Sequence, residues 1–501
     1  MSRSLTQRVG WVALGRLSNI ASLLIVNALL SRLLPLAEYG RYQQVWLVLN
    51  LCVPIFVLGL PSSLNAFLQK QSEDERDRFL TQTVFLLFFP ALLLAGLLAL
   101  GAPTLAAALK DPTLAPLFRS ASLLGFVLIA TGFWDAFLIN YSKHRWLAVS
   151  YGVFSAAFLI AVLAGAFLGK SIEAIFLALG VYSLVRLAGV AFVVWKVVRP
   201  RRGALRADSI REQARFVLPV TLRESLDAIS RWCDKVIITS RFRPDQFAVY
   251  YNGAQQIPFV GLFVDSIFSV AIPDYASAHH RGDKAEIKRL FGLTARRIAF
   301  VIFPLTAASI AVAPDAMAVL FGGAYHESGR YFRVFLTSLP CRISSAGFFL
   351  LAAGRSDWLL YGTILDIVLA IGLGMALIPT LGLFGPAVAS VLATYIQASY
   401  NLRQAGRAVG VPARSLLPWK SLARLALLSA AAGLVSSFGA AFQNPLANVV
   451  CAGGVFLVFF AGVGLGMHAL EAEERALVAR WLGAARRLVS RRGIGTPDSR
   501  Q

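Results

Sequence analysis

Apolar segments of about 20 residues recur along the whole length of this 501-residue chain. A helix of that length crosses the hydrocarbon core of a bilayer and satisfies its own backbone hydrogen bonds there. A chain with many such segments is therefore expected to fold as a bundle of helices. Fourteen segments qualify, at residues 11–34, 43–67, 80–101, 117–140, 147–168, 173–195, 216–239, 246–272, 290–312, 332–353, 358–379, 383–402, 421–441 and 446–467. The sequence predicts an all-α polytopic membrane protein with about 14 transmembrane helices.

The composition agrees with this class and argues against several others. The chain is 57% hydrophobic and 15% charged, whereas soluble domains are about 45–50% apolar and about 25% charged. The net charge of +22 would suggest nucleic acid in a soluble protein, but no basic groove pattern is visible and we expect no nucleic-acid partner. The four cysteines lie singly in apolar segments, without metal-ligand spacing. We expect neither a metal site nor a cofactor.

The distribution of Lys and Arg predicts the orientation. With the N-terminus in the cytoplasm, the inner loops and tails hold 33 of the 48 basic residues and the outer loops hold nine. This excess predicts that both termini are cytoplasmic. The C-terminal segment 469–501 is basic, with apolar residues on one helical face, and is either an interfacial helix on the anionic inner leaflet or a solvated tail. The outer loops are short, which leaves no room for an outer catalytic domain.

A weak internal repeat predicts two similar halves. Ser31–Tyr42 and Ser240–Tyr251 share Ser, Arg, Pro and Tyr at a constant offset of 209, each at the outer turn after the first span of a six-span unit. Units of six spans have the same orientation and are related by an axis along the membrane normal. The predicted organisation is an N-lobe at 1–198, a basic cytoplasmic linker at 199–215, a C-lobe at 216–405, two extra helices at 406–468 and the tail.

A series of short motifs carries a resemblance to a known family. They are RLLPLAEYGRY at 32–42, LGLP at 58–61, DK at 234–235, AVYYNGA at 248–254, VLFGGAY at 319–325 and IPTLGLFGPA at 378–387. In their order and spacing, over about residues 1–405, they resemble the polysaccharide flippases of the multidrug/oligosaccharidyl-lipid/polysaccharide exporter superfamily. One departure is Phe247-Ala248, where the family more often has Gly before the Tyr.

The resemblance implies both an architecture and an activity. It implies a V-shaped pair of six-helix lobes around a central cavity that faces the two sides of the membrane in turn. The implied substrate is a polyprenyl-diphosphate-linked glycan, flipped to the outer leaflet of the bacterial inner membrane for cell-surface polysaccharide such as O-antigen or exopolysaccharide. Glycan polymerase or assembly proteins are the implied partners, and no enzymatic activity is implied.

The segment LRESLDAISRWCDKV at 222–236 carries more charge than an ordinary membrane span. At about 100° per residue its three basic and three acidic residues fall within about one third of the helix circumference. The spacing offers the pairs Arg223–Asp227, Asp227–Arg231 and Arg231–Asp234. A face of this kind usually lines an aqueous cavity. The alternative is a self-neutralised network that holds the lobes together.

Other polar residues inside predicted spans complete the candidate site. Because the planar guanidinium suits phosphate oxygens, Arg16, Arg223 and Arg231 are the first candidates for the diphosphate. The full set for diphosphate and glycan is Arg16, Asn19, Asn27, Arg186, Arg223, Arg231, Lys235 and Arg342. The candidates for coupling to Na⁺ or a proton are Glu224, Asp227, Asp234, Asp265 and Asp366, with Asp135 as a further acid.

Three alternative functions stay open on the sequence. A multidrug or cation exporter of the same superfamily would favour a net acidic cavity, and the charges counted here are nearly balanced. A flippase for the peptidoglycan precursor lipid II is the nearest neighbour, and no residue decides against it. A membrane glycan polymerase or acyltransferase would need a larger outer loop or a His/Asp pair at a membrane face, and neither is visible.

Overall fold

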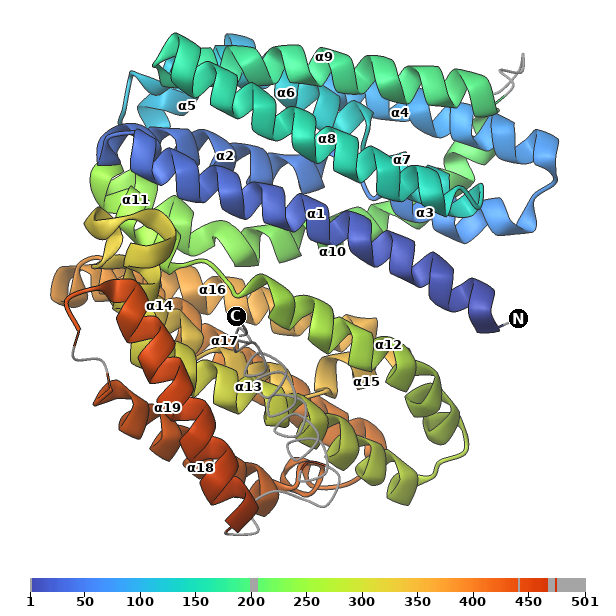
Figure 1. Cartoon of the computed structure of the whole chain (residues 1–501). Coiled ribbons are helices and arrows are strands. Elements are labelled where there is room, and N and C mark those ends of the chain that lie inside the picture. Colours follow the sequence, from blue (N-terminus) through green and yellow to red (C-terminus); the bar gives the residue numbers. More distant parts are fainter. Residues whose placement is uncertain (1, 199–205, 440–441, 467–473, 475–501) are drawn as a thin grey trace, which may run out of the picture. The chain divides into compact units, whose positions relative to one another are not determined.

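The computed structural model describes residues 2–198, 206–439, 442–466 and 474. Within these ranges every regular element is a helix, as the sequence predicts (Figure 1). The predicted linker lies partly outside the described residues, at 199–205, and so does the tail apart from Glu474. The proposal of an interfacial helix there stays a prediction.

All fourteen predicted spans fall on helices. Among the described residues, eight helices are long and apolar enough to cross a membrane, and two bent pairs raise the number to ten. The remaining predicted spans fall on α1 (Ser2–Leu33), α10 (Ala207–Arg241), α17 (Phe384–Val409) and α18 (Trp419–Ser437). These four are more polar or have shorter apolar stretches, so length and composition alone do not identify them. The chain is a multi-pass membrane protein, and fourteen as the span count stays a prediction.

Four predicted spans are interrupted in the structure. The segment 43–67 is divided between α2 (Leu36–Phe56) and α3 (Leu60–Phe67), and 117–140 between α6 (Leu114–Ala130) and α7 (Trp134–Asn140). The segment 246–272 is divided between α11 (Pro244–Gly253) and α12 (Pro258–His280), and 332–353 is interrupted by a 3₁₀ turn at Leu339–Ile343. The breaks in 246–272 and 332–353 each have a proline in the first turn of the following element, at Pro258 and Pro340. Proline has no N–H to donate to the preceding turn but suits a helix start, so it ends one helix and begins the next.

The chain forms two compact units. The first comprises residues 1–252, 320–324 and 363–393, and the second comprises 253–319, 325–362 and 394–501. The units are therefore not continuous in sequence, and α10, which the sequence places in the C-lobe, packs with the N-terminal helices. The predicted lobe boundaries stay a prediction, because compactness in one conformation does not define the parts that move together in transport.

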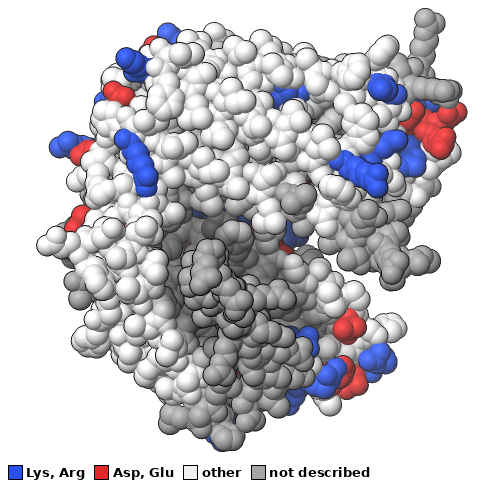
Figure 2. Space-filling view, in the orientation of Figure 1, with Lys and Arg blue, Asp and Glu red and all other residues white. Residues whose placement is uncertain are grey.

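The first unit is a layered bundle of long helices. Besides α1 and α10, with α11 up to Asn252, it contains α2 (Leu36–Phe56), α3 (Leu60–Phe67), α4 (Glu73–Leu100), α5 (Ala102–Ala108), α6 (Leu114–Ala130), α7 (Trp134–Asn140), α8 (His144–Ala164) and α9 (Ile172–Val197), together with parts of α16 and α17. Figure 2 shows that on one face of this unit the charged side chains gather mostly at the two ends of the bundle, with an uncharged surface between them. This is the pattern that a membrane-crossing bundle requires.

The second unit holds the other helices of the chain. They are α12, most of α13 (Lys284–Phe321), α14 (Ser328–Leu336), α15 (Ala346–Ala352), the start of α16 (Ser356–Leu381), the second half of α17, α18 and α19 (Pro445–Gly466). Tyr275 of α12 lies in the core of this unit, where its hydroxyl is 3.0 Å from the hydroxyls of both Thr294 and Ser345. Such buried hydroxyl contacts fix the packing of helices that are otherwise joined by apolar surfaces.

The two similar turns of the internal repeat lie against each other in the first unit. A Cβ added to Gly40 would lie 1.9 Å from the carbonyl oxygen of Pro244, so only glycine fits at this crossing. The neighbouring Tyr39 donates a hydrogen bond of 2.9 Å to Asn252 Oδ1. The matched turns therefore form the close contact between the start of α2 and the start of α11.

Candidate functional site

The charged helix α10 is anchored near its N-terminal end by a buried amide. Gln213 is 1% exposed. Its Nε2 donates to the hydroxyls of Ser63 at 2.8 Å and Thr83 at 2.9 Å, and its Oε1 accepts from Gln82 at 2.7 Å. A buried amide with these partners specifies one rotation of the helix, because any other would leave polar groups unpaired. This contact sets the direction in which the charges of α10 point.

The first four charges of the stripe at 222–236 lie on an accessible surface. Arg223 and Arg231 are exposed, while Glu224 and Asp227 are partly buried. Arg223 Nε lies 3.9 Å from Asp227 Oδ2, one of the predicted pairs. Glu224 accepts a 3.3 Å hydrogen bond from the hydroxyl of Ser62 on α3. These contacts are long and open, so the group is available to a ligand.

The last two charges of the stripe are buried and satisfied within the protein. Asp234 and Lys235 have side chains that are 3% and 10% exposed, and Lys235 Nζ lies 3.3 Å from Asp234 Oδ2. The hydroxyl of Tyr250 donates to the same oxygen at 2.9 Å. Lys235 Nζ also lies 5.3 Å from the ring centre of Trp232, within the range of a cation–π contact. The sequence did not indicate Tyr250, which lies on α11 and becomes a neighbour only in the folded unit.

Neighbouring helices explain why this half of α10 is buried. On one side, Gln44 of α2 donates a hydrogen bond to Thr239, and both side chains are 1% exposed. On another side, Cys233 packs in an apolar cluster with Ala370 and Ala393. Small residues on α16 and α17 let these helices approach closely. The C-terminal part of α10 is therefore enclosed by helices distant in sequence.

Asp366 of α16 completes this buried region. It is 6% exposed and accepts a 2.5 Å hydrogen bond from the hydroxyl of Ser230 on α10. Among the described residues, its partner is thus a neutral hydroxyl and not a cation. A buried carboxylate without a cationic partner is costly as an anion. The sequence indicated Asp366 but gave no sign of Ser230.

A second group of predicted residues meets in a pocket of the first unit. The pocket has a volume of about 350 Å³, and Asn19, Asp135 and Arg186 are among the residues that line it. Asp135 accepts a hydrogen bond from the hydroxyl of Tyr151, and Arg186 lies over the ring of Phe154, 5.5 Å from its centre. The Nε of Arg186 is buried and has no hydrogen-bond partner among the described residues. The aromatic lining gave no signal in the sequence, because aromatic residues are common throughout these helices.

The other predicted site residues are placed elsewhere. Asn27 accepts a 3.1 Å hydrogen bond from Gln43 in the first unit. Asp265 is exposed on α12 of the second unit, where Arg342 donates a 2.8 Å hydrogen bond to Gln256. Arg16 belongs to α1, but its side chain lies outside the described part of the structure. The assignment of these residues to one substrate site stays a prediction.

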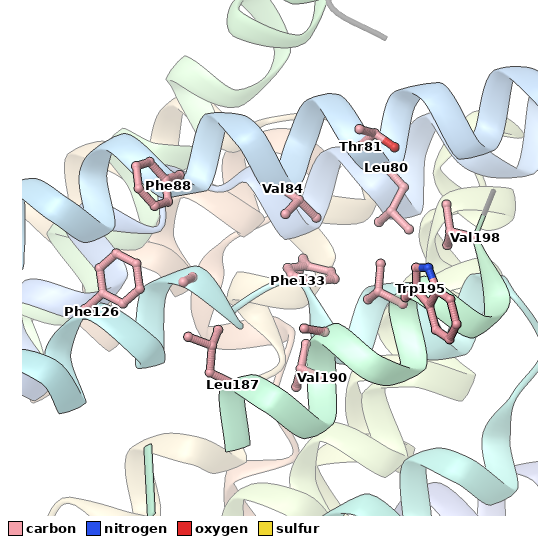
Figure 3. Close-up of a pocket in the computed structure, with 13 residues that line it drawn as sticks. Leu80, Thr81, Val84, Phe88, Phe126, Phe133, Leu187, Val190, Trp195 and Val198 are labelled. Carbon is pink, nitrogen blue, oxygen red and sulfur yellow. The ribbon is translucent and has the colours of Figure 1, made fainter. Parts of the chain in front are cut away.

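A further pocket of the first unit is almost entirely apolar. It has a volume of about 410 Å³ and lies among α4, α6 and α9. Figure 3 shows Phe88 and Phe126 at one end and Trp195 and Val198 at the other. The hydroxyl of Thr81 and the indole nitrogen of Trp195 are the polar side-chain atoms of its lining residues. This pocket can contact hydrocarbon but has no group that would hold a diphosphate.

Comparisons with known proteins identify the family and the fold. Residues 29–330, more than half of the chain, match the family model described as polysaccharide biosynthesis protein. Comparison with curated protein sequences gives no match. A structure of the lipid II flippase MurJ in an inward closed conformation superposes with a TM-score of 0.71 at 15% identity, covering 92% of this chain and 99% of the other.

Multidrug transporters have the same fold. An inward-facing transporter of the MATE family, described as part of the MOP superfamily, gives a TM-score of 0.64 at 14% identity and covers 79% of this chain and 94% of that one. The Vibrio cholerae MATE transporter VcmN in its bent form gives 0.54 at 15% identity, with 81% and 97% covered. These low identities establish the fold alone. The present chain belongs to the polysaccharide biosynthesis protein family, and it has the transporter fold of MurJ and the MATE proteins.

Proposed function

We propose that this protein flips a polyprenyl-diphosphate-linked oligosaccharide from the cytoplasmic to the outer leaflet of the bacterial inner membrane by alternating access. Family membership and a transporter fold support this proposal. The observation that carries it is the accessible half of α10, where Arg223 and Arg231 are exposed on a helix between two apolar flanks. Exposed guanidinium groups at this depth are costly in lipid, and their usual setting is an aqueous substrate path.

The arginines match the chemistry of the proposed substrate. A diphosphate carries oxygens that a guanidinium can bind in a bidentate manner. Arg223 has one weak acidic neighbour at 3.9 Å, so little interaction is lost when an anion replaces it. Lys235, another predicted ligand, is already paired with Asp234. In this proposal Arg223 and Arg231, with Arg16, bind the diphosphate, and Lys235 supports the helix.

For ion coupling we favour Asp366 among the predicted carboxylates. Asp234 and Asp227 each have a cationic partner, whereas Asp366 is buried with the hydroxyl of Ser230. Uptake of a proton or Na⁺ by Asp366 would remove an unfavourable buried charge. Its hydrogen bond to Ser230 of α10 would connect that event to the charged helix. We infer that ion binding at Asp366 biases the conformation of α10.

A lipid II flippase is the second candidate, because the structure that gives the TM-score of 0.71 is described as the lipid II flippase MurJ. Lipid II would use the same diphosphate contacts. The exporter alternative has weaker support from the charges, since the accessible half of the stripe carries two arginines and two acids and is therefore not net acidic. The two flippase candidates, for lipid-linked oligosaccharide and for lipid II, differ in the glycan that the lipid carries.

The test is to delete the gene and measure the leaflet in which lipid-linked oligosaccharide accumulates. We expect accumulation in the inner leaflet, which the parent gene reverses and Arg231→Ala or Arg16→Ala does not. Arg243→Ala is the matched control, since Arg243 is 79% exposed but lies beyond the end of α10. Normal outward delivery of the oligosaccharide in the deletion strain would reject the flippase. Inner-leaflet accumulation of lipid II alone would select the second candidate.

A further inference from the structure

The second unit has a basic pocket of its own. It has a volume of about 560 Å³ and is lined by α12, α13, the first turn of α18 and Glu474. Three arginines of α13 line it, Arg289, Arg296 and Arg297. Spacings of seven and eight residues place them on neighbouring parts of one helical face. The rest of the lining is largely apolar, so positive charge is concentrated beside a hydrocarbon-compatible surface.

Arg296 is the central group of this pocket. Arg296 is only 8% exposed, although its guanidinium group is charged. Its Nε and Nη2 donate to the two carboxylate oxygens of Glu474 at 2.6 and 2.5 Å, and Nη1 donates to the carbonyl oxygen of Ser421 at 3.4 Å. This is a bidentate contact between the guanidinium fork and an oxyanion. The pocket is thus shaped to hold two oxygens in the plane of a buried arginine.

Glu474 lies 178 residues after Arg296 in the chain. A phosphate group presents a similar pair of oxygens, and the arginine fork binds carboxylate and phosphate in the same geometry. We propose that this pocket binds the phosphate of an anionic membrane phospholipid, and that Glu474 occupies the same position and competes with it. This proposal is independent of the transported substrate.

The rest of the pocket favours a lipid over a soluble anion. Phe263 and Phe300 contribute apolar walls beside Arg296, suited to the glyceride and the first part of an acyl chain. Arg297 is exposed, and Arg289 is exposed with a bidentate contact to Glu286. Surface arginines of this kind attract anionic headgroups of the inner leaflet. The volume is within the range of ligand pockets, about 300–1,000 Å³.

The test measures binding of a soluble short-chain lipid to the full-length protein in an uncharged detergent. Dioctanoyl phosphatidylglycerol is titrated by native mass spectrometry, with inorganic phosphate and dioctanoyl phosphatidylcholine in parallel. Removing the competitor with Glu474→Gln is expected to tighten phosphatidylglycerol binding on the order of tenfold, and Arg296→Gln to weaken it by a similar factor. Arg296→Lys, which keeps the charge without the fork, is expected to lie between the parent and Arg296→Gln.

Asp357→Asn is the matched control for Glu474→Gln. Both changes remove one negative charge from an arginine–carboxylate pair, but the Arg355–Asp357 pair, at 3.1 Å, is exposed and outside the pocket. The control is expected to leave phosphatidylglycerol binding unchanged. An equal gain in Asp357→Asn would show a general charge effect and overturn the proposal, and so would no gain in Glu474→Gln.

The parallel ligands distinguish the sources of phosphate. Phosphatidylglycerol binding that is tighter than inorganic phosphate and depends on Arg296 supports a lipid site. Inorganic phosphate that binds as tightly would overturn the lipid assignment and assign a soluble anion. Glu474→Gln retains Arg296, so the comparison with Asp357→Asn decides the competition even if Arg296→Gln does not fold.

Discussion

The two halves of the charged stripe on α10 both carry acids and bases, but they have opposite environments. The half containing Arg223, Asp227 and Arg231 is open, and Arg223 Nε lies 3.9 Å from Asp227 Oδ2. The half containing Asp234 and Lys235 is buried, and Lys235 Nζ lies 3.3 Å from Asp234 Oδ2. The charged side chains of the first half are accessible to a ligand, whereas those of the second half are already paired within the protein. The comparison shows that one charged face of a membrane helix can be accessible along one part and enclosed along another.

The largest expected effect concerns the closed half. Asp234→Ala leaves the ammonium of Lys235 buried without its carboxylate partner, and should lower the free energy of unfolding by about 3–5 kcal/mol. Asp234→Leu combined with Lys235→Met removes both charges and should recover most of that loss. Chemical denaturation in detergent measures both. A single variant as stable as the parent would show that this half is not enclosed.

The open half should respond in activity and not in stability. Arg231→Lys keeps the charge but loses the planar fork, and outward delivery of lipid-linked oligosaccharide should fall about tenfold, with a larger fall for Arg231→Gln. The free energy of unfolding should change by less than about 0.5 kcal/mol, as for other exposed substitutions. Leaflet assays at matched expression, with Tm measured on the same preparations, test this. A fall in Tm that accompanies the fall in delivery would show that Arg231 stabilises the fold and would contradict its role in substrate binding.

An ion pair outside α10 provides a reference of intermediate burial. In the turn before α6, Asp111 accepts hydrogen bonds from Arg41 Nε at 2.9 Å and from the Thr113 N–H at 3.1 Å. Burial alone would raise the pKa of Asp111, but the hydrogen bonds from Arg41 and Thr113 outweigh it and hold the pKa below its usual value. Asp111→Asn should cost about 1–3 kcal/mol at neutral pH.

The pH dependence of this pair has a defined sign. Because the folded-state pKa of Asp111 is lowered, its contribution is complete above the unfolded pKa of about 3.9 and is lost as the pH falls through the folded-state pKa. The difference in Tm between the parent and Asp111→Asn should therefore be constant at neutral pH and shrink below about pH 4. A difference that grows on acidification would contradict the assignment.

The smallest expected effect is the coupling between Arg223 and Asp227. Their side chains are 60% and 40% exposed, and such i,i+4 pairs contribute about 0.3–0.5 kcal/mol. A double-mutant cycle with alanine at both positions should give a coupling energy in that range that decreases in high salt. A coupling above about 2 kcal/mol would place this pair in the same class as Asp234–Lys235 and remove the contrast between the two halves.

Much of the architecture follows from local sequence. Apolar length predicts the helices, and the matched turns at Ser31–Tyr42 and Ser240–Tyr251 were visible as a repeat before their contact was known. The breaks at Pro258 and Pro340 were missed, although proline gives a local reason for each. Hydropathy continues across such breaks, so a count of apolar residues does not detect them.

The candidate site also has one part that follows from local sequence and another that depends on tertiary contacts. The helical period places all six charges of the segment 222–236 on one face of α10, and that inference uses only neighbouring residues. Whether a given charge is exposed depends on Gln44, Ala370 and Ala393, which come from other helices. The common pocket of Asn19 and Arg186 likewise depends on the packing of α1 against α8 and α9.

The sequence by itself determined that this protein is a helical membrane protein with charge arranged along one helix, because hydrophobic length and helical period are local properties. Only the tertiary structure decided which of those charges are open and which are enclosed. Burial and pairing depend on contacts between different helices: Asp234 meets Tyr250 across the α10–α11 turn, and Ser230 meets Asp366 from α16, 136 residues away in the chain. No local pattern encodes such contacts, and they divide the charges that hold the fold from those available to a substrate.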